Sequence, residues 1–487
     1  MGHEAFTNGR FSEQTLSNVE AAFQAFQQVI ERYPVQSIRA AGTSALRDSE
    51  NTLELVKLVR NSVGIPIEII SGEEEARLIH MSIRHRLVDI DNRAALLIDI
   101  GGGSVEITLC ERGDIVAVES FRMGTVRLIE WFSSGDADTL DHSLMNEYIE
   151  SMLRKVREAL KGRTIDICVG TGGNIEALGD LGVNLLGNES GNCLSAKDIR
   201  RLCKRLKSMT CAERVEKLLL RPDRADVIIP ATLLLKAITG LAEPADLLVP
   251  RVGLGDGILL DLLKGHEPGG EVAGHQALTW AAALAEKFHA DLAHAARVAG
   301  LARSLFEQLK GVHDLSPRDL LLLDVAAQIH EIGLAVRPAR HHRHAEYLVS
   351  ASPMIGLSLD EKALVAALLR CQRKRFPQPG HEPFERLSER DQKRLQQLTI
   401  LLRLAIALDK ERRGQVTRVE LSEANEHEEQ GLTMTLHGHG DRSLEAWSVR
   451  KQISYLQLVF GRDLKIVVSD PELGSDVTLD SGAGDED

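Results

Sequence analysis

The chain has 487 residues, of which 43% are hydrophobic and 4% aromatic, and a formal net charge of −13 at pH 7; this length is sufficient for three or four domains. The negative charge disfavours nonspecific attraction to nucleic acid, and the few aromatic residues disfavour a stacking surface for single strands. Six cysteines without CxxC spacing indicate reduced thiols rather than disulfides or zinc ligands, and no apolar stretch reaches the roughly 20 residues of a membrane span.

The first part of the chain has the alternating pattern of an α/β fold. Hydrophobic periodicity predicts, in chain order, a helix, a strand, a helix and a strand over Glu13–Arg32, Ser37–Ala41, Thr52–Asn61 and Pro66–Ile70. Ser71 is then a suitable N-cap for a helix that continues to about Arg86.

Three glutamates occupy the first turn of this helix, at positions 73, 74 and 75. Acidic residues there interact favourably with the helix dipole, which accounts for two of the three. Glu75 lies one turn into the helix, where a carboxylate beside a metal-bound phosphate can accept a proton from an attacking water. We therefore single out Glu75 as a candidate general base.

The next segment joins a hydrophobic strand to a glycine turn flanked by two carboxylates. Residues Ala94–Ile98 and Val105–Cys110 have the pattern of strands, and the glycines between them let backbone N–H groups approach an anion without interference from a Cβ. A hairpin would bring Asp99 and Glu106 to the same end, where a hydrated Mg²⁺ ion can lie beside a phosphate. The alternative is a tight glycine turn in an ordinary hairpin.

A second glycine turn follows the predicted strand Thr164–Val169, with the sequence Gly170-Thr171-Gly172-Gly173. A turn of this kind can hold a phosphate at a helix N-terminus. It is also compatible with a tight strand-to-helix connection that binds nothing.

Together with the segment Ala41–Arg47, these motifs resemble in order and spacing the exopolyphosphatase and guanosine pentaphosphate phosphohydrolase (Ppx/GppA) family. The resemblance extends to about residue 470. It implies an α/β actin-like (ASKHA) two-domain ATPase-type fold, followed by an all-α HD-like domain and a small C-terminal α+β unit. The expected ranges are 1–80 and 81–264 for the actin-like domains, 271–412 and 413–470 for the other two, and 471–487 for a disordered acidic tail.

The resemblance also implies roles for individual residues. Glu75 matches the general base, and Asp99 and Glu106 match metal-proximal acids that would hold Mg²⁺, or Mn²⁺ in its place. The residues that match phosphate or substrate contacts are Arg47, Gly101, Gly102, Gly103, Ser104, Gly170, Thr171, Gly172 and Gly173.

The function that this resemblance implies is that of a cytoplasmic, Mg²⁺-dependent exopolyphosphatase of the EC 3.6.1.11 type, which releases orthophosphate from the ends of inorganic polyphosphate. A homodimer is also implied. Three alternatives stay open: a guanosine pentaphosphate 5′-phosphohydrolase, a catalytically silent regulator that binds polyphosphate or guanosine alarmones, and a sugar-kinase or chaperone-type ATPase. Turnover of polyphosphate, of guanosine pentaphosphate or of ATP would distinguish them.

One departure from the family pattern concerns the beginning of the chain. Family members have a strand and a loop of the Asp-Leu-Gly-Ser-Asn-Ser type before the segment that matches Met1–Arg10, and this first phosphate loop is missing here. We expect either a start at an internal methionine or a truncated gene. A chain of this length is expected to have weak or absent catalysis.

From about Pro268 the chain becomes almost continuously helical, after a linker at Gly265–Gly270. Residues in the order used by HD-type phosphohydrolases follow, namely His294, His330-Glu331, His344 and Asp409. Because Glu331 stands where a metal-binding HD domain has Asp, the resemblance implies a metal-free domain that shapes a substrate channel. Strands are predicted near the end, at Val416–Leu421, Leu432–His437 and Leu464–Val468.

Charge is distributed unevenly over this second part. The stretch Arg337–Arg375 has eight arginines and lysines and three acids, a net charge of +5, which could attract a polyanion. The alternative is a solvated surface that balances the acidic remainder. Residues Asp470–Asp487 include seven acids and no base, a composition typical of disorder.

Overall fold

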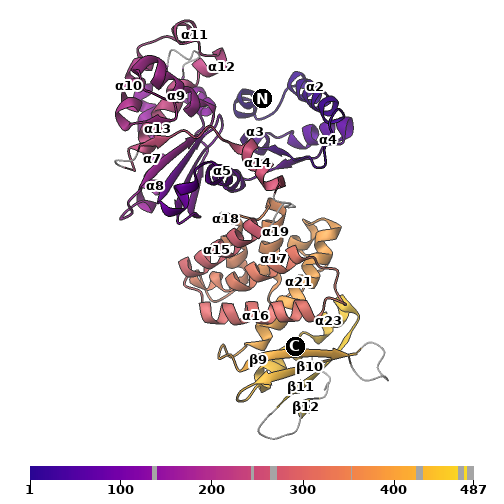
Figure 1. The fold of residues 1–487 in the computed structure, drawn as a ribbon. Coiled ribbons are helices and arrows are strands. Elements are labelled where there is room, and N and C mark those ends of the chain that lie inside the picture. The colour runs from indigo at the N-terminus through magenta and orange to yellow at the C-terminus, as the bar shows by residue number, and fades with distance from the viewer. Residues whose placement is uncertain are drawn as a thin grey trace. The chain divides into compact units, whose positions relative to one another are not determined.

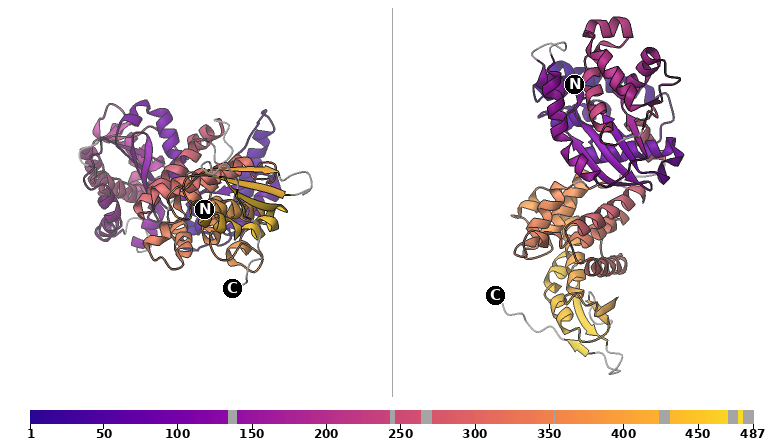
Figure 2. Two further views of the ribbon diagram at one scale, coloured as in Figure 1. Left: turned by 90° about the horizontal axis from the view of Figure 1, so that it is seen from below. Right: turned by 90° about the vertical axis from the view of Figure 1, so that its left-hand side faces the viewer.

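The structure is a computed structural model, and it describes residues 1–133, 140–242, 246–263, 271–352, 354–423, 431–469 and 477–479. The chain divides into two compact units, residues 1–268 and residues 269–487, which we call the first and the second unit (Figures 1 and 2). Among the described residues, no helix is both long and apolar enough to cross a membrane.

The first unit alternates helices and strands, as the sequence pattern predicts. Its helices are α1 (Gly2–Thr7), α2 (Glu13–Ile30), α3 (Ser44–Asp48), α4 (Thr52–Val63), α5 (Gly72–Arg86), α6 (Thr125–Phe132), α7 (His142–Met152), α8 (Arg154–Ala159), α9 (Gly173–Leu186), α10 (Ala196–Lys207), α11 (Cys211–Leu218), α12 (Pro222–Ala225), α13 (Ile228–Thr239) and α14 (Leu254–Leu263), with a 3₁₀ turn η1 (Val88–Asn92). Its strands are β1 (Ala40–Gly42), β2 (Ile67–Ile69), β3 (Ala95–Ile100), β4 (Val105–Glu111), β5 (Asp114–Phe121), β6 (Ile167–Thr171), β7 (Cys193–Leu194) and β8 (Leu247–Leu248).

The predicted helices over Glu13–Arg32 and Thr52–Asn61 are confirmed as α2 and α4. The strand predicted at Ser37–Ala41 begins later, at Ala40. Strand β1 pairs in parallel with β2 over three residues of each strand, so the residues before Ala40 have no ladder to join.

The main sheet has six strands in the order β5-β4-β3-β6-β8-β7, and β3 lies antiparallel to β4 and parallel to β6. Alternate side chains of β3 and β4, including Ile98 and Ile107, enter the main hydrophobic core of this unit. Because successive side chains of a strand point to opposite faces, Asp99 and Glu106 lie on the other face. Helix α5 packs on β4 and β5, whereas α13 packs on β3.

Helix α5 begins as predicted. The hydroxyl of Ser71 accepts a hydrogen bond from the backbone N–H of Glu74 at 3.1 Å, and the helix then runs without interruption to Arg86. The expected boundary between residues 80 and 81 therefore lies inside one continuous helix. Most of α5 is buried, because it packs against α14 as well as against the sheet.

The second unit is helical up to residue 408 and ends in a small sheet. Its helices are α15 (Glu271–Lys287), α16 (Leu292–Gln308), α17 (Pro317–Ile329), α18 (His341–Ala351), α19 (Leu359–Cys371), α20 (Glu382–Glu385), α21 (Glu389–Leu408), α22 (Ser443–Arg450) and α23 (Ile453–Phe460), with a 3₁₀ turn η2 (Ile332–Ala335). Its strands are β9 (Val416–Glu423), β10 (Gly431–Gly438), β11 (Asp463–Val468) and β12 (Val477–Leu479), in the order β12-β11-β10-β9.

The three C-terminal strands predicted from the sequence are confirmed as β9, β10 and β11. Their inward side chains, including Met434 and Ile466, share one hydrophobic core with the preceding helices. The predicted linker at residues 265–270 lies outside the described residues, and so does most of the acidic tail. Disorder was the wrong prediction for Val477–Leu479, because these residues pair antiparallel with the edge of β11 as β12.

Candidate active site

Three carboxylates meet on the face of the main sheet that is covered by α5. Asp99 of β3 and Glu106 of β4 are direct partners in the antiparallel ladder, so their side chains point the same way. Glu75 reaches them from the first turns of α5. One oxygen of each carboxylate lies within 4.8 Å of the others. The structure thus brings together the three acids that the sequence singled out.

The glutamates in the first turn of α5 have different surroundings. The carboxylate of Glu74 accepts two hydrogen bonds from Arg77, each at 2.8 Å. Arg77 also donates to Asp261 of α14 at 3.1 Å and is 1% exposed. Glu74 is thus tied to a buried ion-pair network. Glu73 is partly exposed, and Glu75 alone points to the sheet carboxylates.

Hydroxyl groups hold the two sheet carboxylates. The Oγ1 of Thr171 donates to Oδ1 of Asp99 at 2.8 Å, and the Oγ of Ser120 donates to Oε1 of Glu106 at 2.8 Å. Ser104 also hydrogen-bonds Glu106. The other oxygen of Glu106, Oε2, is buried and has no hydrogen-bond partner in the described part of the chain. Thr171 and Ser104, which we expected at phosphate, thus contact the acids.

Burial and mutual repulsion make these carboxylates weak acids. Burial is the main cause that raises the pKa of Glu106 to about 8, and the charges of Glu75 and Asp99 add to it. Burial likewise raises the pKa of Glu75 to about 7, although the guanidinium of Arg47 opposes the rise. Burial also raises the pKa of Asp99, against the hydrogen bond from Thr171. Of the three acids, Glu75 alone forms an ion pair within the described residues, with Arg47, and the two sheet carboxylates have no positive partner there.

This environment fits a hard divalent cation. Carboxylate oxygens are the ligands that Mg²⁺ and Mn²⁺ prefer. The unpartnered Oε2 of Glu106 and the raised pKa values both indicate that the folded protein lacks enough positive charge at this point. A bound cation would supply that charge, and Asp99 and Glu106 are the residues that could hold it.

Arg47 lies beside Glu75. Its Nη1 donates to the Oε2 of Glu75 at 3.2 Å and to the backbone oxygen of Ile70 at 2.7 Å. Arg47, which we expected at phosphate, therefore lies next to the candidate base, and its guanidinium holds that carboxylate.

The first glycine turn is anchored by the start of α6. The carbonyl oxygens of Gly101 and Gly102 accept hydrogen bonds from Thr125 and Val126 at 3.0 and 2.9 Å. Within the described residues, the N–H groups of Gly102 and Gly103 have no acceptor. The turn therefore keeps donors that could contact an anion.

Residues that the sequence did not reveal lie against this turn. A Cβ placed on Gly103 would lie 2.1 Å from the ring of Phe6 and 2.7 Å from Oγ of Ser44, so a larger residue would not fit. Arg127 stacks over the Phe6 ring at 4.1 Å and donates to the carbonyl of Gly103 at 2.8 Å. Phe6 is far from the glycine turn in sequence and belongs to no motif, so no sequence pattern near it predicts its contact with the turn.

The second glycine turn closes on the same carboxylates. Gly170 and Thr171 end β6, and Gly172, with φ of +93°, caps α9 and packs against Asp99. A residue with a side chain would be strained at this φ. Gly173 begins α9 and lies against the guanidinium of Arg224, which donates to the side chain of Asn174 at 2.8 Å. Arg224 is a second cation that the sequence did not reveal.

Comparison with known proteins shows the family of this chain. The model of the Ppx/GppA phosphatase family matches residues 2–266, and the model of Ppx/GppA phosphatase domain III matches residues 279–452. The first unit thus has the actin-like, ATPase-type fold of these phosphatases. The chain belongs to the Ppx/GppA phosphatase family.

Solved structures that are similar to this chain include two that illustrate the range of the match. An exopolyphosphatase from Cytophaga hutchinsonii is 25% identical with a TM-score of 0.50, and the match covers 54% of this chain and 86% of that one. The Ppx/GppA family member of Aquifex aeolicus is 24% identical with a TM-score of 0.47, and the match covers 55% of this chain and 87% of that one.

Proposed function

We propose that this chain is a Mg²⁺-dependent exopolyphosphatase, which hydrolyses the terminal phosphoanhydride bond of inorganic polyphosphate and releases orthophosphate. The observation that carries the proposal is the meeting of Glu75, Asp99 and Glu106 beside two glycine turns, in a chain of a phosphatase family. The similarity to the exopolyphosphatase of Cytophaga hutchinsonii supports polyphosphate as the substrate.

Glu75 acts as the general base in this proposal. It takes a proton from a water molecule, whose oxygen attacks the terminal phosphorus while the bond from that phosphorus to the bridging oxygen breaks. A base is most effective when its pKa lies near the working pH, and burial raises the pKa of Glu75 to about 7. Its ion pair with Arg47 holds the carboxylate in one orientation.

The remaining residues bind and stabilise charge. Asp99 and Glu106 would hold Mg²⁺, which when bound would neutralise charge on the transferring phosphoryl group. In this proposal the N–H groups of Gly102 and Gly103 donate to phosphate oxygens. Both groups are free to do so, since none of the described residues accepts a hydrogen bond from them. Arg224, beside the N-terminus of α9, adds positive charge at the second turn.

The experiment measures orthophosphate release by the purified chain from long-chain polyphosphate, guanosine pentaphosphate and ATP, each with Mg²⁺ and with a chelator. We expect release from polyphosphate that requires the metal. Release from guanosine pentaphosphate alone would assign the chain to the pentaphosphatase branch, and release from ATP alone would assign it to the ATPases of this fold. Tight binding of polyphosphate without release would identify a regulator.

A further inference from the structure

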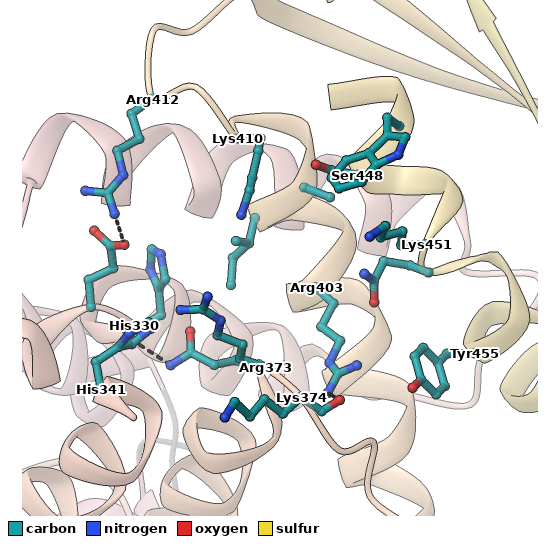
Figure 3. Close-up of a pocket in the computed structure, with 16 residues that line it drawn as sticks. His330, His341, Arg373, Lys374, Arg403, Lys410, Arg412, Ser448, Lys451 and Tyr455 are labelled. Atoms are coloured by element: carbon teal, nitrogen blue, oxygen red, sulfur yellow. Dashed lines mark hydrogen bonds and ion pairs between the residues drawn. The ribbon is translucent and has the colours of Figure 1, made fainter. Parts of the chain in front are cut away.

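The second unit contains a cationic cavity of its own. It has a volume of about 680 Å³, and six arginines and lysines line it but only one acid, Glu331. The basic residues are Arg373, Lys374, Arg403, Lys410, Arg412 and Lys451. In Figure 3, His330, His341 and Arg412 lie toward one side of the cavity, and Ser448, Lys451 and Tyr455 lie toward the other.

Three potential metal ligands are gathered at the histidine side of this cavity. His294 comes from α16, and His330 and Glu331 follow α17. One nitrogen of each imidazole and one carboxylate oxygen lie within 4.8 Å of one another. All three side chains are buried, with exposed fractions of 3%, 2% and 8%. The cluster is therefore preformed rather than a set of surface residues that happen to be close.

Hydrogen bonds fix which nitrogen of each histidine is available. The Nδ1 of His294 faces Oδ2 of Asp409 at 2.7 Å, and the Nδ1 of His330 donates to the backbone oxygen of Ala327 at 2.7 Å. Both rings therefore carry the proton on Nδ1 and keep the lone pair on Nε2. Asp409 is itself held by Arg297 and by the N–H of Gly414. Histidines that bind metals are usually oriented in this way.

Two acceptors in the cluster are unsatisfied. The Nε2 of His330 and the Oε2 of Glu331 are buried, and neither has a hydrogen-bond partner within the described residues. Arg412 pairs with the other oxygen of Glu331, as the dashed line in Figure 3 marks, and this leaves Oε2 unpaired. A cation between the two acceptors would satisfy both.

We propose that His294, His330 and Glu331 bind a divalent transition-metal ion, and that the cavity holds a phosphate group which completes the coordination of that ion. Two imidazoles and one carboxylate suit Zn²⁺, Co²⁺ or Mn²⁺ better than Mg²⁺. Three protein ligands leave positions open, and His330 and Glu331 line the cavity, so these positions face it. This differs from the metal-free domain that the replacement of Asp by Glu331 led us to expect.

The cations of the cavity point to phosphate as the ligand. Arg403 donates to three backbone carbonyls and so serves the fold. In contrast, none of the acids in the described residues forms an ion pair with Arg373, Lys374 or Lys410. Figure 3 shows these three side chains within the cavity, between the histidines and Tyr455. Such a site attracts an anion of several charges, and phosphate oxygens are also good metal ligands.

The metal is tested by titration of the chelator-treated full chain with Co²⁺. Nitrogen ligands and a low coordination number give Co²⁺ a strong visible absorption, which distinguishes this cluster from the all-carboxylate set of Glu75, Asp99 and Glu106. We expect this absorption in the wild-type chain and in the Glu75→Gln variant, and its loss in His330→Gln. His344→Gln, from α18 and outside the cluster, is the matched control and keeps the absorption.

An unchanged absorption in both His330→Gln and His294→Gln would overturn the proposal, and so would its absence from the wild-type chain. Circular dichroism in the presence of chelator verifies that the variants fold. If His330→Gln does not fold, Glu331→Gln replaces it, because the amide keeps the shape of the side chain and an acceptor for Arg412. Loss of the Co²⁺ band in folded Glu331→Gln supports the proposal, and its retention contradicts it.

The phosphate is tested with inorganic pyrophosphate added to the Co²⁺-loaded chain. Entry of a phosphate oxygen into the coordination shell shifts the visible band, and we expect this shift to weaken in Lys410→Gln and in Arg373→Gln. Pyrophosphate bound in the first unit does not alter this band. A band that does not move at saturating pyrophosphate would overturn the assignment of phosphate as the ligand.

Discussion

The two clusters of ligand groups in this chain solve opposite electrostatic problems. In the first unit, Glu75, Asp99 and Glu106 bring three acids together, and burial raises the pKa values of all three. Repulsion from neighbouring carboxylates raises the pKa values of Glu75 and Glu106 further. In the second unit, burial keeps His330 neutral by lowering its pKa, and the cavity beside it has an excess of positive charge. The first cluster therefore lacks positive charge, and the second offers nitrogen lone pairs next to a cavity lined by basic residues.

The clusters also differ in how they are held. The carboxylates are positioned by one strand ladder and one helix, and the helix is locked by ion pairs of Arg77 with Glu74 and Asp261. The histidines are held by single hydrogen bonds, of which the one from His294 reaches a residue 115 positions later in the sequence. The geometry of the first cluster therefore depends on a buried charge network, whereas that of the second depends on the packing of helices that are distant in sequence.

The largest expected effect concerns Glu75. The Glu75→Gln variant removes the proposed general base but keeps the shape of the side chain, so we expect the rate of orthophosphate release from polyphosphate to fall roughly 10²–10⁴-fold. Glu73→Gln, in the same helical turn but pointing away from the sheet acids, is the control and should retain its rate. Equal rates for Glu75→Gln and the wild type would remove Glu75 from the mechanism.

The buried network gives the next effect. Arg77→Met leaves Glu74 and Asp261 without their buried partner, so we expect the free energy of unfolding of the first unit to fall by about 3–5 kcal/mol. Arg84→Met, on the same helix, removes a half-exposed pair with Asp91 and should cost roughly 0–1 kcal/mol. Urea unfolding measures both. If both variants lose only a small and similar amount of unfolding free energy, the buried ion pairs do not hold α5 in place.

The pH dependence of stability should have opposite signs in the two units when metals are chelated. Glu75 and Glu106 have folded-state pKa values of about 7 and 8, above their ordinary value of 4.5, so the folded state holds more protons. The free energy of unfolding of the first unit therefore falls as pH rises from about 4.5 to about 8. His330 has a folded-state pKa of about 3, below its ordinary 6.5, so stability of the second unit rises with pH between these values.

Hydrogen exchange followed by mass spectrometry reports the two units separately and can test these slopes. The Glu106→Gln variant should flatten the fall in the first unit and leave the second unit unchanged. His330→Gln should flatten the rise in the second unit alone. Parallel slopes in both units would mean that these groups do not control the pH dependence.

The sequence was a good guide where contacts are local. Three glycines between two hydrophobic runs predicted the hairpin, and with it the meeting of Asp99 and Glu106 at one end. Ser71 predicted the start of α5, and with it the position of Glu75. Each of these inferences needs only neighbouring residues, because turn chemistry and helix capping act over a few positions.

The sequence was a poor guide where distant segments meet. Phe6 against Gly103 and Arg224 against Gly173 depend on the tertiary packing of helices that carry no motif. The predicted basic stretch Arg337–Arg375 contributes Arg373 and Lys374 to the cavity. The other basic residues of the cavity come from α21, from the turn after α21 and from the C-terminal end of α22. Side chains so far apart in sequence cannot be grouped before the fold is known.

The smallest expected effect concerns two equivalent helix caps, one in each unit. Ser71 accepts from the N–H of Glu74 at the start of α5, and Ser358 accepts from the N–H of Glu361 at the start of α19, at 3.1 and 3.2 Å. Replacing either serine by alanine should lower the free energy of unfolding of its own unit by about 1 kcal/mol. Urea titrations with exchange measurements on each unit provide the test. Because α5 is also locked by Arg77, a much larger loss for Ser71→Ala than for Ser358→Ala would mean that the cap, rather than the ion pairs, holds Glu75 in place.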